Sequence, residues 1–442
     1  MLLSSCAAPA PKAGERPSPS HQPTQTATAL PLGVGADEAL KLCARSASGN
    51  VCLSPAQVHE FYDLNPLYTR GFDGKGTTIV ILVPLGSPTI QNDVHVFDQT
   101  FALPDPPHLE VLKPPLTLVS NPATNDFFDW AGETTLDVEW AHAIAPGANI
   151  VVLVSPVHET EGVQGFPELE QLSRYALDHH LGQVFSQSFG ASEPTLLGNP
   201  CNQNLGSGED LVQDYDQNVY QRAVQEHVTI LAGSGDEGPT NVDCSEHTTY
   251  SYANVLWPAS DPLVTAVGGT DMFPQGQTGK YGSEQVWNDG RASGGGLSLL
   301  FKEPDWQKNL PTQSRLNGSR AIPDVSWGAQ AVFPIYHSYP GASAGWSAGG
   351  GTSAAAPQWA GLIALADQMA GQPLGFLNPA LYKLAGKGFH DITKGSTSLH
   401  SVTGFRAGQG WDMATGWGTP DAAILLPLLI ATVQQINDAT SP

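Results

Sequence analysis

The most informative segment reads Gly350-Gly351-Thr352-Ser353-Ala354-Ala355-Ala356-Pro357, a glycine turn that leads into an apolar helix running toward Met369. This pattern predicts that Ser353 lies in the first turn of the helix, where small neighbours let another backbone approach closely. The backbone amide of such a serine, favoured by the helix dipole, can stabilise an oxyanion. A serine that only caps a helix looks the same. Ser353 alone therefore indicates either a nucleophile or a helix cap.

A second predicted helix carries two carboxylates. It reads Gly132-Glu133-Thr134-Thr135-Leu136-Asp137-Val138-Glu139-Trp140, so Glu133 and Asp137 lie one turn apart on one face. Carboxylates at this spacing repel each other, and we expect one of them to hold a proton. A solvated acidic face is the simpler interpretation. The apolar stripe through Trp140 and Ile144 favours partial burial, with both carboxylates at the rim of the stripe.

Short β-branched runs alternate with helical stretches in the first half of the chain. Strands are predicted at residues 77–85, 149–154, 183–188 and 228–232, and helices at 136–145, 168–179 and 213–226. This order predicts an α/β fold with a doubly wound parallel sheet and helices on both faces. A closing helix is expected at 422–433. We predict a single catalytic domain at 61–435, after a short segment at 37–60.

The motif Gly-Thr-Ser-Ala-Ala-Ala-Pro resembles the nucleophile motif of the subtilisin-like fold, which subtilisins share with sedolisins, the serine-carboxyl peptidases. A subtilisin needs an aspartate at the end of the first buried strand and a histidine followed by Gly-Thr. Here that strand ends in Val83-Pro84-Leu85-Gly86, and none of the 13 histidines precedes Gly-Thr. Glu133 and Asp137 instead resemble the ExxxD motif of sedolisins. The resemblance runs from about residue 53 to about residue 420.

The sedolisin resemblance implies a role for four side chains. Ser353 would be the nucleophile, Glu133 its general base, and Asp137 the residue that orients Glu133. Asp236, in the turn Ser234-Gly235-Asp236-Glu237-Gly238, would be protonated and would donate a hydrogen bond to the oxyanion. Without the other three, this segment would be read as an ordinary turn, because glycine and aspartate dominate turns.

The segment Ser186-Gln187-Ser188-Phe189-Gly190 resembles the sedolisin strand that pairs with the substrate. The resemblance implies that main-chain groups of Ser188 and Gly190 bind an extended polypeptide. A strand of the protein core is the alternative interpretation, since such segments are common in cores.

Two segments near the C-terminus resemble the sedolisin calcium site. The resemblance implies one structural calcium ion, bound by the carboxylates of Asp391 and Asp412 and the carbonyls of Ile392, Gly408 and Gly410. These are the hard oxygen ligands that calcium prefers, and a water can complete six-coordination. A pair of Asp/Gly turns without metal is the alternative.

Composition narrows the classes of partner. The chain has 19 Lys and Arg against 42 Asp and Glu, and the net charge of -23 argues against nucleic acid as a partner. Only 14% of the residues are charged, which suits an acidic environment because few ion pairs are lost on acidification. No apolar run reaches the roughly 18 residues of a membrane span. We expect a monomer acting on polypeptides.

The N-terminal residues indicate an extracytoplasmic location. Leu3-Ser4-Ser5-Cys6 resembles a bacterial lipobox, which predicts membrane attachment through a lipid on Cys6, and residues 1–36 read as an anchor and a flexible tether. A chance match in a tail is the alternative. The other four cysteines form two groups, Cys43 with Cys52 and Cys201 with Cys244, which two disulfides would explain. We therefore predict a secreted or envelope-anchored protein.

Two further hypotheses stay open at the level of sequence. One is a Ser-His-Asp hydrolase of the subtilisin type with a displaced histidine, which predicts a neutral pH optimum. The other is an inactive relative that serves as a surface binding lipoprotein. The four residues Ser353, Glu133, Asp137 and Asp236 argue against the second, because a binding protein has no need of a protonatable acid beside a serine.

Overall fold

A computed structural model describes residues 39–40, 52–120, 127–159, 162–198, 207–245, 248–276, 278–310, 316–339, 341 and 345–440. The expected anchor and tether at 1–36, and Cys6, Cys43 and Cys201, lie outside these ranges. Cys52 and Cys244 are both disulfide-bonded. The expected division of the chain at residues 36 and 60 stays a prediction.

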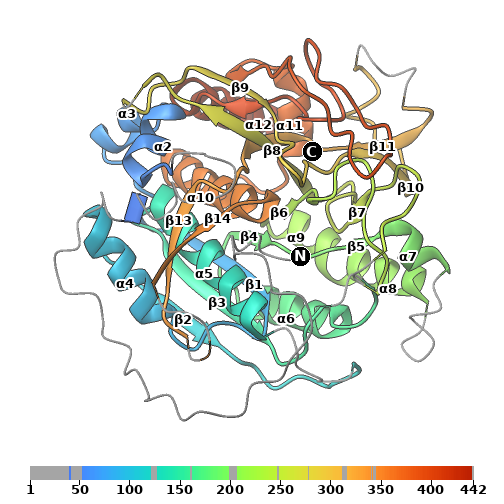
Figure 1. Ribbon diagram of the computed structural model, residues 1–442, viewed down its shortest axis with the longest axis horizontal. Coiled ribbons are helices and arrows are strands. Elements are labelled where there is room, and N and C mark those ends of the chain that lie inside the picture. Colours follow the sequence, from blue (N-terminus) through green and yellow to red (C-terminus); the bar gives the residue numbers. More distant parts are fainter. Residues whose placement is uncertain are drawn as a thin grey trace, which may run out of the picture.

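A sheet of eight strands forms the centre of the described structure (Figure 1). Seven parallel strands lie in the order β12-β8-β6-β4-β1-β3-β2, and β9 pairs antiparallel with β8. Their bounds are β1 Thr78–Pro84, β2 Leu109–Leu112, β3 Asn149–Ser155, β4 Val184–Gln187, β6 Thr229–Gly233, β8 Thr265–Phe273, β9 Ser283–Val286 and β12 Val325–Gly328. The winding direction reverses at β1. In such sheets, ligands bind beyond the carboxyl ends of the strands near the reversal.

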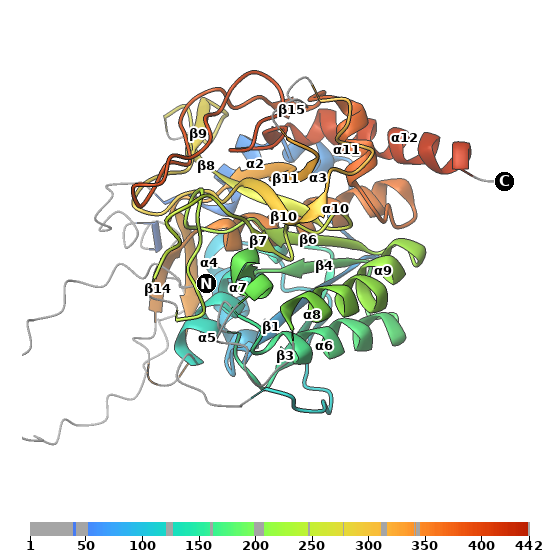
Figure 2. The ribbon, with the colours of Figure 1, turned by 90° about the vertical axis from the view of Figure 1, so that its right-hand side faces the viewer.

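Helices cover both faces of this sheet, as the alternating strand residues require. Along β1, Ile79, Ile81 and Val83 face one core, whereas Val80 and Leu82 face the other. The first core packs against α4, α5, α10 and α12, and the second against α6, α8 and α9 (Figure 2). These helices are α4 Ile90–Phe101, α5 Phe127–Ile144, α6 Phe166–Asp178, α8 Gly208–Tyr215, α9 Gln221–Gln225, α10 Thr352–Ala370 and α12 Ala422–Thr440.

Shorter elements surround the central layers. Among the described residues, four two-stranded sheets pair β5 with β7, β10 with β11, β13 with β14, and β15 with β16. The remaining bounds are α2 Pro55–Phe61, α3 Asn65–Thr69, α7 Glu193–Gly198, α11 Asn378–Leu384, β5 Ala191–Ser192, β7 Leu256–Trp257, β10 Gly296–Lys302, β11 Ser319–Ile322, β13 Phe333–His337, β14 Gly345–Gly349, β15 Phe389–His390 and β16 Thr419–Pro420. Helix α2 spans the expected boundary at residue 60 and buries Val58 and Phe61 in the first core.

Two predicted helices begin earlier than expected. Helix α5 starts at Phe127 instead of residue 136. Helix α8 starts at Gly208 because the Ser207 side chain accepts hydrogen bonds from the amides of Glu209 and Asp210, and a π-helical turn at Asp216–Tyr220 joins α8 to α9.

Helices α5 and α10 pack closely against each other. A Cβ atom on Gly361 of α10 would lie 2.7 Å from Ile144 Cβ and 2.9 Å from the Ala141 carbonyl oxygen of α5. The indole of Trp359 on α10 also donates to the Ser326 carbonyl of β12 at 2.9 Å. The helix that begins beside Ser353 is therefore fixed between the sheet and α5.

The closing helix α12 is longer than expected and combines two environments. Leu425, Leu426 and Leu429 belong to the first core, whereas Ile424 is 53% exposed. By length and composition alone, Ala422–Ala439 could cross a membrane, although a third of that window (33%) is buried against the domain. The buried leucines indicate that this helix closes the domain.

Candidate active site

Ser353 and Glu133 meet between α10 and α5. Both side chains are buried, with 2% of Ser353 and 1% of Glu133 exposed. The Ser353 hydroxyl donates a hydrogen bond to the Glu133 carboxyl group, and this bond lowers the pKa of Glu133. Within the described residues, Glu133 Oε1 accepts no hydrogen bond. The serine is therefore paired with a carboxyl group that can take its proton.

Burial dominates the acidity of this pair of carboxyl groups. It raises the pKa of Glu133 to about 7, although the Ser353 hydrogen bond and the charge of Arg291 act in the opposite direction. Burial also raises the pKa of Asp137 well above its usual value, and the charge of Glu133 adds to this. The two carboxyl groups consequently share protons and titrate as a group.

Both acids lie deeper than the sequence predicts. The expected rim position is wrong because α5 is buried on all sides from Trp130 to Ile144, packed against the sheet, α10, α4 and β13. Asp137 is 0% exposed, and its Oδ1 accepts a hydrogen bond of 2.8 Å from the Ser188 hydroxyl. Ser188 thus supports Asp137 through its side chain.

Asp236 lies in the loop after β6 and contacts the residue before the serine. Its Oδ1 accepts hydrogen bonds of 2.8 Å from both the amide and the hydroxyl of Thr352. The Thr352 hydroxyl in turn accepts from the Gly235 amide at 3.1 Å. Because both of these hydrogen bonds engage Oδ1, Oδ2 is the oxygen atom that can form a hydrogen bond with a ligand.

Gly351 is required where the chain turns into α10. Its φ of +85° lies in the left-handed region that favours glycine. A Cβ atom there would also lie 2.4 Å from Asp236 Oδ2. This glycine lets the start of α10 approach the oxygen atom that faces the site.

The structure places the expected substrate strand beside these groups. Ser188 and Gly190 follow β4, the neighbour of both β1 and β6, and both residues are buried. A Cβ on Gly190 would lie 3.0 Å from the Trp257 carbonyl oxygen, so the backbone approaches β7 closely at this point. Their role toward a substrate backbone stays a prediction.

Three histidine side chains of the described residues have partners other than Ser353. His59 Nε2 contacts the Ala143 carbonyl at 2.7 Å, His142 pairs with Asp98 at 3.2 Å, and His400 pairs with Glu237 at 2.6 Å. The hydrogen bond from Ser353 to Glu133 therefore occupies the position that a histidine base would take in a subtilisin.

The expected calcium ligands come together in space. The Asp391 carboxylate accepts a hydrogen bond from the Gly410 amide at 3.0 Å, which joins the two segments. The Asp412 carboxylate accepts from the amides of Gly408 at 2.7 Å and Ala414 at 2.9 Å. No group of three or more His, Cys, Asp or Glu side chains suited to a metal occurs in the described part, but the expected set uses only two carboxylates. The residues therefore fit a calcium ion bound mainly through carbonyl oxygens.

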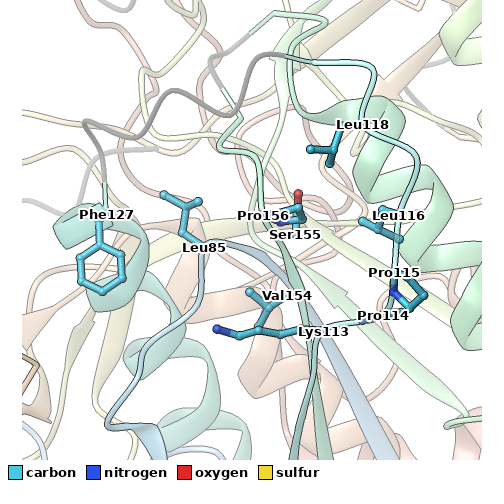
Figure 3. A pocket seen from close by; sticks show the side chains of 10 residues that line it. All are labelled: Leu85, Lys113, Pro114, Pro115, Leu116, Leu118, Phe127, Val154, Ser155 and Pro156. Atoms are coloured by element: carbon cyan, nitrogen blue, oxygen red, sulfur yellow. The ribbon is translucent and has the colours of Figure 1, made fainter.

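A pocket of about 510 Å³ lies at the carboxyl ends of β1 and β3 (Figure 3). Its lining is mostly apolar and consists of Leu85, Lys113, Pro114, Pro115, Leu116, Leu118, Phe127, Val154, Ser155 and Pro156. Leu85 follows β1 with a φ of +57°, a conformation that a leucine rarely adopts. Phe127 begins α5, the helix that carries Glu133 two turns later.

Several residues of the site escape prediction from the sequence. The Ser188 hydroxyl and Thr352 act through side chains whose partners lie 51 and 116 residues away along the chain. Arg291 lies 3.8 Å from Asp236 and 2.8 Å from Glu237, and no local motif marks it. The acidic Glu237 beside Asp236 was the one available signal that a cation lies nearby.

Comparison with known proteins identifies the family. Residues 130–387 match the model of the subtilase family. Kumamolisin from Bacillus sp. (strain MN-32) is 32% identical over 391 residues, which are 86% of this chain and 64% of kumamolisin. The solved structure of Pseudomonas sedolisin, a serine-carboxyl proteinase complexed with two molecules of pseudo-iodotyrostatin, superposes with a TM-score of 0.67 at 25% identity, covering 86% of this chain and 98% of that one. The chain belongs to the sedolisin family.

This sedolisin also resembles a mammalian relative. Tripeptidyl-peptidase 1 of Canis lupus familiaris is 32% identical over 325 residues, which are 67% of this chain and 52% of that protein. The chain thus spans between about half and two thirds of the length of these curated relatives. Membership of the family confirms the predicted subtilisin-like α/β fold with a single catalytic domain.

Proposed function

We propose that this sedolisin is an acid-active serine-carboxyl endopeptidase. The observation that carries the proposal is the hydrogen bond between Ser353 and Glu133 inside a buried site that also holds Asp137 and Asp236. A serine paired with a carboxyl base, beside a further acid at a strand end, has the parts needed for acyl transfer. The kumamolisin and sedolisin relatives support this class of reaction.

In acylation, Ser353 Oγ attacks the carbonyl carbon of the scissile bond while its proton passes to the Glu133 carboxylate. The tetrahedral oxyanion accepts hydrogen bonds from the Ser353 amide and from protonated Asp236 Oδ2. When the C–N bond breaks, the leaving amine takes the proton from Glu133, which leaves an acyl ester on Ser353. Water then attacks the ester and gives a proton to Glu133, which again acts as base. When the ester C–O bond breaks, Glu133 returns this proton to Ser353 Oγ and the acid product leaves.

The reaction needs Glu133 ionised and a proton on Asp236 in the same molecule. Neighbouring carboxyl groups hold their protons in common, so the rate depends on how many protons the group carries. Burial raises the pKa of Glu133 to about 7. A carboxylic acid can donate a hydrogen bond to an oxyanion only while it is protonated, and the proposed role of Asp236 therefore leads us to expect an optimum in the acidic range.

The substrate would lie in extended form along the carboxyl edge of the sheet. Asp236 follows β6 and Leu85 follows β1, with β4 between them. Strands about 4.8 Å apart place these loops about 10 Å from each other, which is about three residues of extended peptide. Main-chain groups of Ser188 and Gly190 would pair with the peptide on this path. The pocket beside Leu85 would then take an apolar side chain about three residues from the scissile bond.

A structural calcium ion and an extracytoplasmic location complete the proposal. Asp391 and Asp412, with the carbonyls of Ile392, Gly408 and Gly410, would hold the ion and fix the two C-terminal loops. The lipobox-like Cys6 and the disulfide-bonded Cys52 and Cys244 support a secreted or envelope-anchored protein. Polypeptides are the proposed substrates, and a monomer is the proposed state.

The test is cleavage of an unfolded protein between pH 3 and pH 8 by the wild type, Ser353→Ala and Glu133→Gln, with products identified by mass spectrometry. Cleavage in acid that both variants abolish supports the serine-carboxyl mechanism. Internal cuts, as opposed to release of tripeptides, support an endopeptidase.

Two outcomes would replace the proposal with its alternatives. Activity that depends on Ser353 at neutral pH but survives Glu133→Gln would point to a histidine base. Folded wild type that cleaves nothing at any pH with calcium present, yet captures polypeptides, would point to a binding protein.

A further inference from the structure

Beside the proposed active site lies a cluster of polar side chains, Arg291, Glu237 and His400, that the proposed reaction does not use. Arg291 Nη2 and Nε donate to Glu237 Oε1 at 2.8 Å and 3.1 Å. His400 Nε2 contacts the other oxygen, Glu237 Oε2, at 2.6 Å. Arg291 Nη1 lies 3.8 Å from Asp236 Oδ2. The cluster therefore ends at the oxygen proposed to face the oxyanion.

Backbone pairing holds this arrangement in place. The Ala292 amide donates to the Asp236 carbonyl at 2.9 Å, and the Gly294 amide donates to the Gly235 carbonyl at 2.7 Å. The loop after β6 and the loop after β9 thus run side by side. Arg291 cannot leave Asp236 without breaking its bonds to Glu237, and Glu237 is restrained in turn by His400.

The charges in this cluster are partly removed from solvent. The exposed fraction of the side chain is 5% for Asp236, 17% for Glu237 and 23% for Arg291. Water screens charges less at such depths than at the surface, so a cation here acts on the carboxyl groups around it.

We propose that Arg291 is a positioning residue whose charge, 3.8 Å from Asp236 Oδ2, sets the pH range in which the carboxyl groups of the active site work. This inference rests on the proposed peptidase function. A guanidinium beside a set of acids favours their ionised forms, so each proton leaves the set at a lower pH than it would without Arg291. Glu237 offsets part of this charge and thereby limits the effect.

The groups that face Glu133 agree with this role. Asp137 lies on the same helix, Asp236 approaches from the loop after β6, Arg291 from the loop after β9, and Ser353 from α10. The charge of Asp236 raises the pKa of Glu133, and the charge of Arg291 lowers it. Among the described residues, Arg291 is thus a cation that counters the acids of the site.

The inference predicts opposite shifts for two neutral substitutions. Arg291→Met removes a positive charge, so the whole profile of kcat/KM against pH moves upward, by about half to one pH unit. Glu237→Gln removes a negative charge and leaves Arg291 uncompensated, so the profile moves downward. General destabilisation cannot produce shifts in both directions.

The experiment measures kcat and KM with a peptide substrate between pH 3 and pH 8 for the wild type and four variants. Arg291→Lys keeps the charge and should restore most of the wild-type profile. Arg222→Met is the matched control, because Arg222 also pairs with two carboxylates, those of Asp178 and Glu226, but on α9. In Arg291→Met, kcat should fall more than KM changes, and thermal unfolding establishes that each variant is folded.

Unchanged profiles in folded Arg291→Met and Glu237→Gln, beside an active wild type, would overturn the inference and leave the proposed function intact. Absence of Ser353-dependent cleavage by the wild type would instead overturn the proposed function. The two failures are therefore distinguishable.

Discussion

The hydroxyl of Ser188, the residue after β4, donates a hydrogen bond of 2.8 Å to Asp137 Oδ1 of α5. It is the contact that holds the acid behind Glu133, because Asp137 Oδ2 has no hydrogen-bond partner in the described residues. A segment expected to bind substrate through its main chain therefore also supports the catalytic acids through a side chain.

Ser188→Ala should reduce kcat/KM by about tenfold, which corresponds to about 1.4 kcal/mol of transition-state stabilisation. In the wild type, the hydrogen bond from Ser188 lowers the pKa of Asp137. Its removal therefore favours the protonated form of Asp137 and loosens the support of Glu133. Ser186→Ala is the matched control, since the Ser186 hydroxyl is buried on β4 without a hydrogen-bond partner in the described residues. Equal rates for the two variants would show that the Ser188 hydroxyl is unimportant.

Gly351→Ala should lower kcat by about 100-fold or more while the protein stays folded. The new Cβ would lie 2.4 Å from Asp236 Oδ2, and a φ of +85° strains any side chain. Gly371→Ala at the other end of α10 is the control, because its φ is +69° and no atom lies within 4 Å of the added Cβ. Steady-state kinetics of both variants separate the clash from the strain. Wild-type activity in Gly351→Ala would contradict the assignment of Asp236 to the site.

Stability should decrease as the pH rises from about 4 to about 8. Burial raises the pKa of Asp261 and Glu284 to about 7 and that of Asp367 to about 8. A buried acid with a raised pKa stabilises the fold while it is protonated, and this contribution is lost as the pH passes the pKa of the folded state. The melting temperature, measured across this range, should fall by several degrees.

Asp367→Asn tests the origin of this decrease. The amide keeps an oxygen for the Leu374 amide, which donates to Asp367 at 2.8 Å, but it cannot ionise. The variant should therefore lose less stability than the wild type between pH 6 and pH 8. Asp305→Asn, at a side chain that is 94% exposed, should keep the wild-type slope. A melting temperature that rises toward pH 8 would refute the linkage.

Removal of calcium should lower the melting temperature, and calcium but not magnesium should restore it. The five expected ligands supply a flexible set of carbonyl and carboxylate oxygens, which suits the larger ion. Asp391→Ala should abolish the response to chelator, because the Asp391 side chain otherwise accepts a single hydrogen bond within the described residues, from the Gly410 amide. Calorimetry with and without chelator measures the melting temperature independently of activity. A melting temperature indifferent to chelator in the wild type would exclude the calcium site.

Leu118→Trp should weaken cleavage of peptides with a large apolar residue about three positions from the scissile bond. Leu118 lines the pocket beside Leu85 and is 49% exposed, so an indole can fold into the pocket. Peptides with glycine at that position should be cleaved as by the wild type. Leu299→Trp, at a 55% exposed leucine of β10, is the control. Equal losses for both peptides would argue against a specificity pocket.

The sheet could be predicted from the sequence because its strands are short β-branched runs buried on both faces. The predicted strand at 77–85 is one residue longer than β1 at each end, and the predicted strand at 149–154 starts with β3 and ends one residue before it. Helix starts were less predictable. The beginning of α5 mixes aromatic, acidic and glycine residues, so its first turns lack the period of a surface helix. Its burial throughout comes from packing against α10, α4, β1 and β13, which are distant in the sequence or outside its own segment.

The proposed catalytic set could be named from motifs, but its surroundings could not. Ser353, Glu133, Asp137 and Asp236 stand in recognisable local patterns, and the structure brings all four into one region. Arg291 has no such pattern, because its partner Glu237 lies 54 residues earlier and only the pairing of two loops makes them neighbours. Long-range pairing of this kind leaves no periodic trace in the sequence.

The close approach of α5 and α10 at Gly361 means that the sequences of these helices can change less freely than the sequences of the surrounding loops. Ser353 and Glu133 are carried by core helices whose close spacing requires a residue without a Cβ atom at position 361. Substitutions at the surface therefore leave the geometry of these two groups unchanged. Most of the pocket lining and the charged cluster belong to loops, which can vary without moving those helices. Selectivity and working pH can thus diverge between relatives while the bond-breaking apparatus is inherited as a fixed unit.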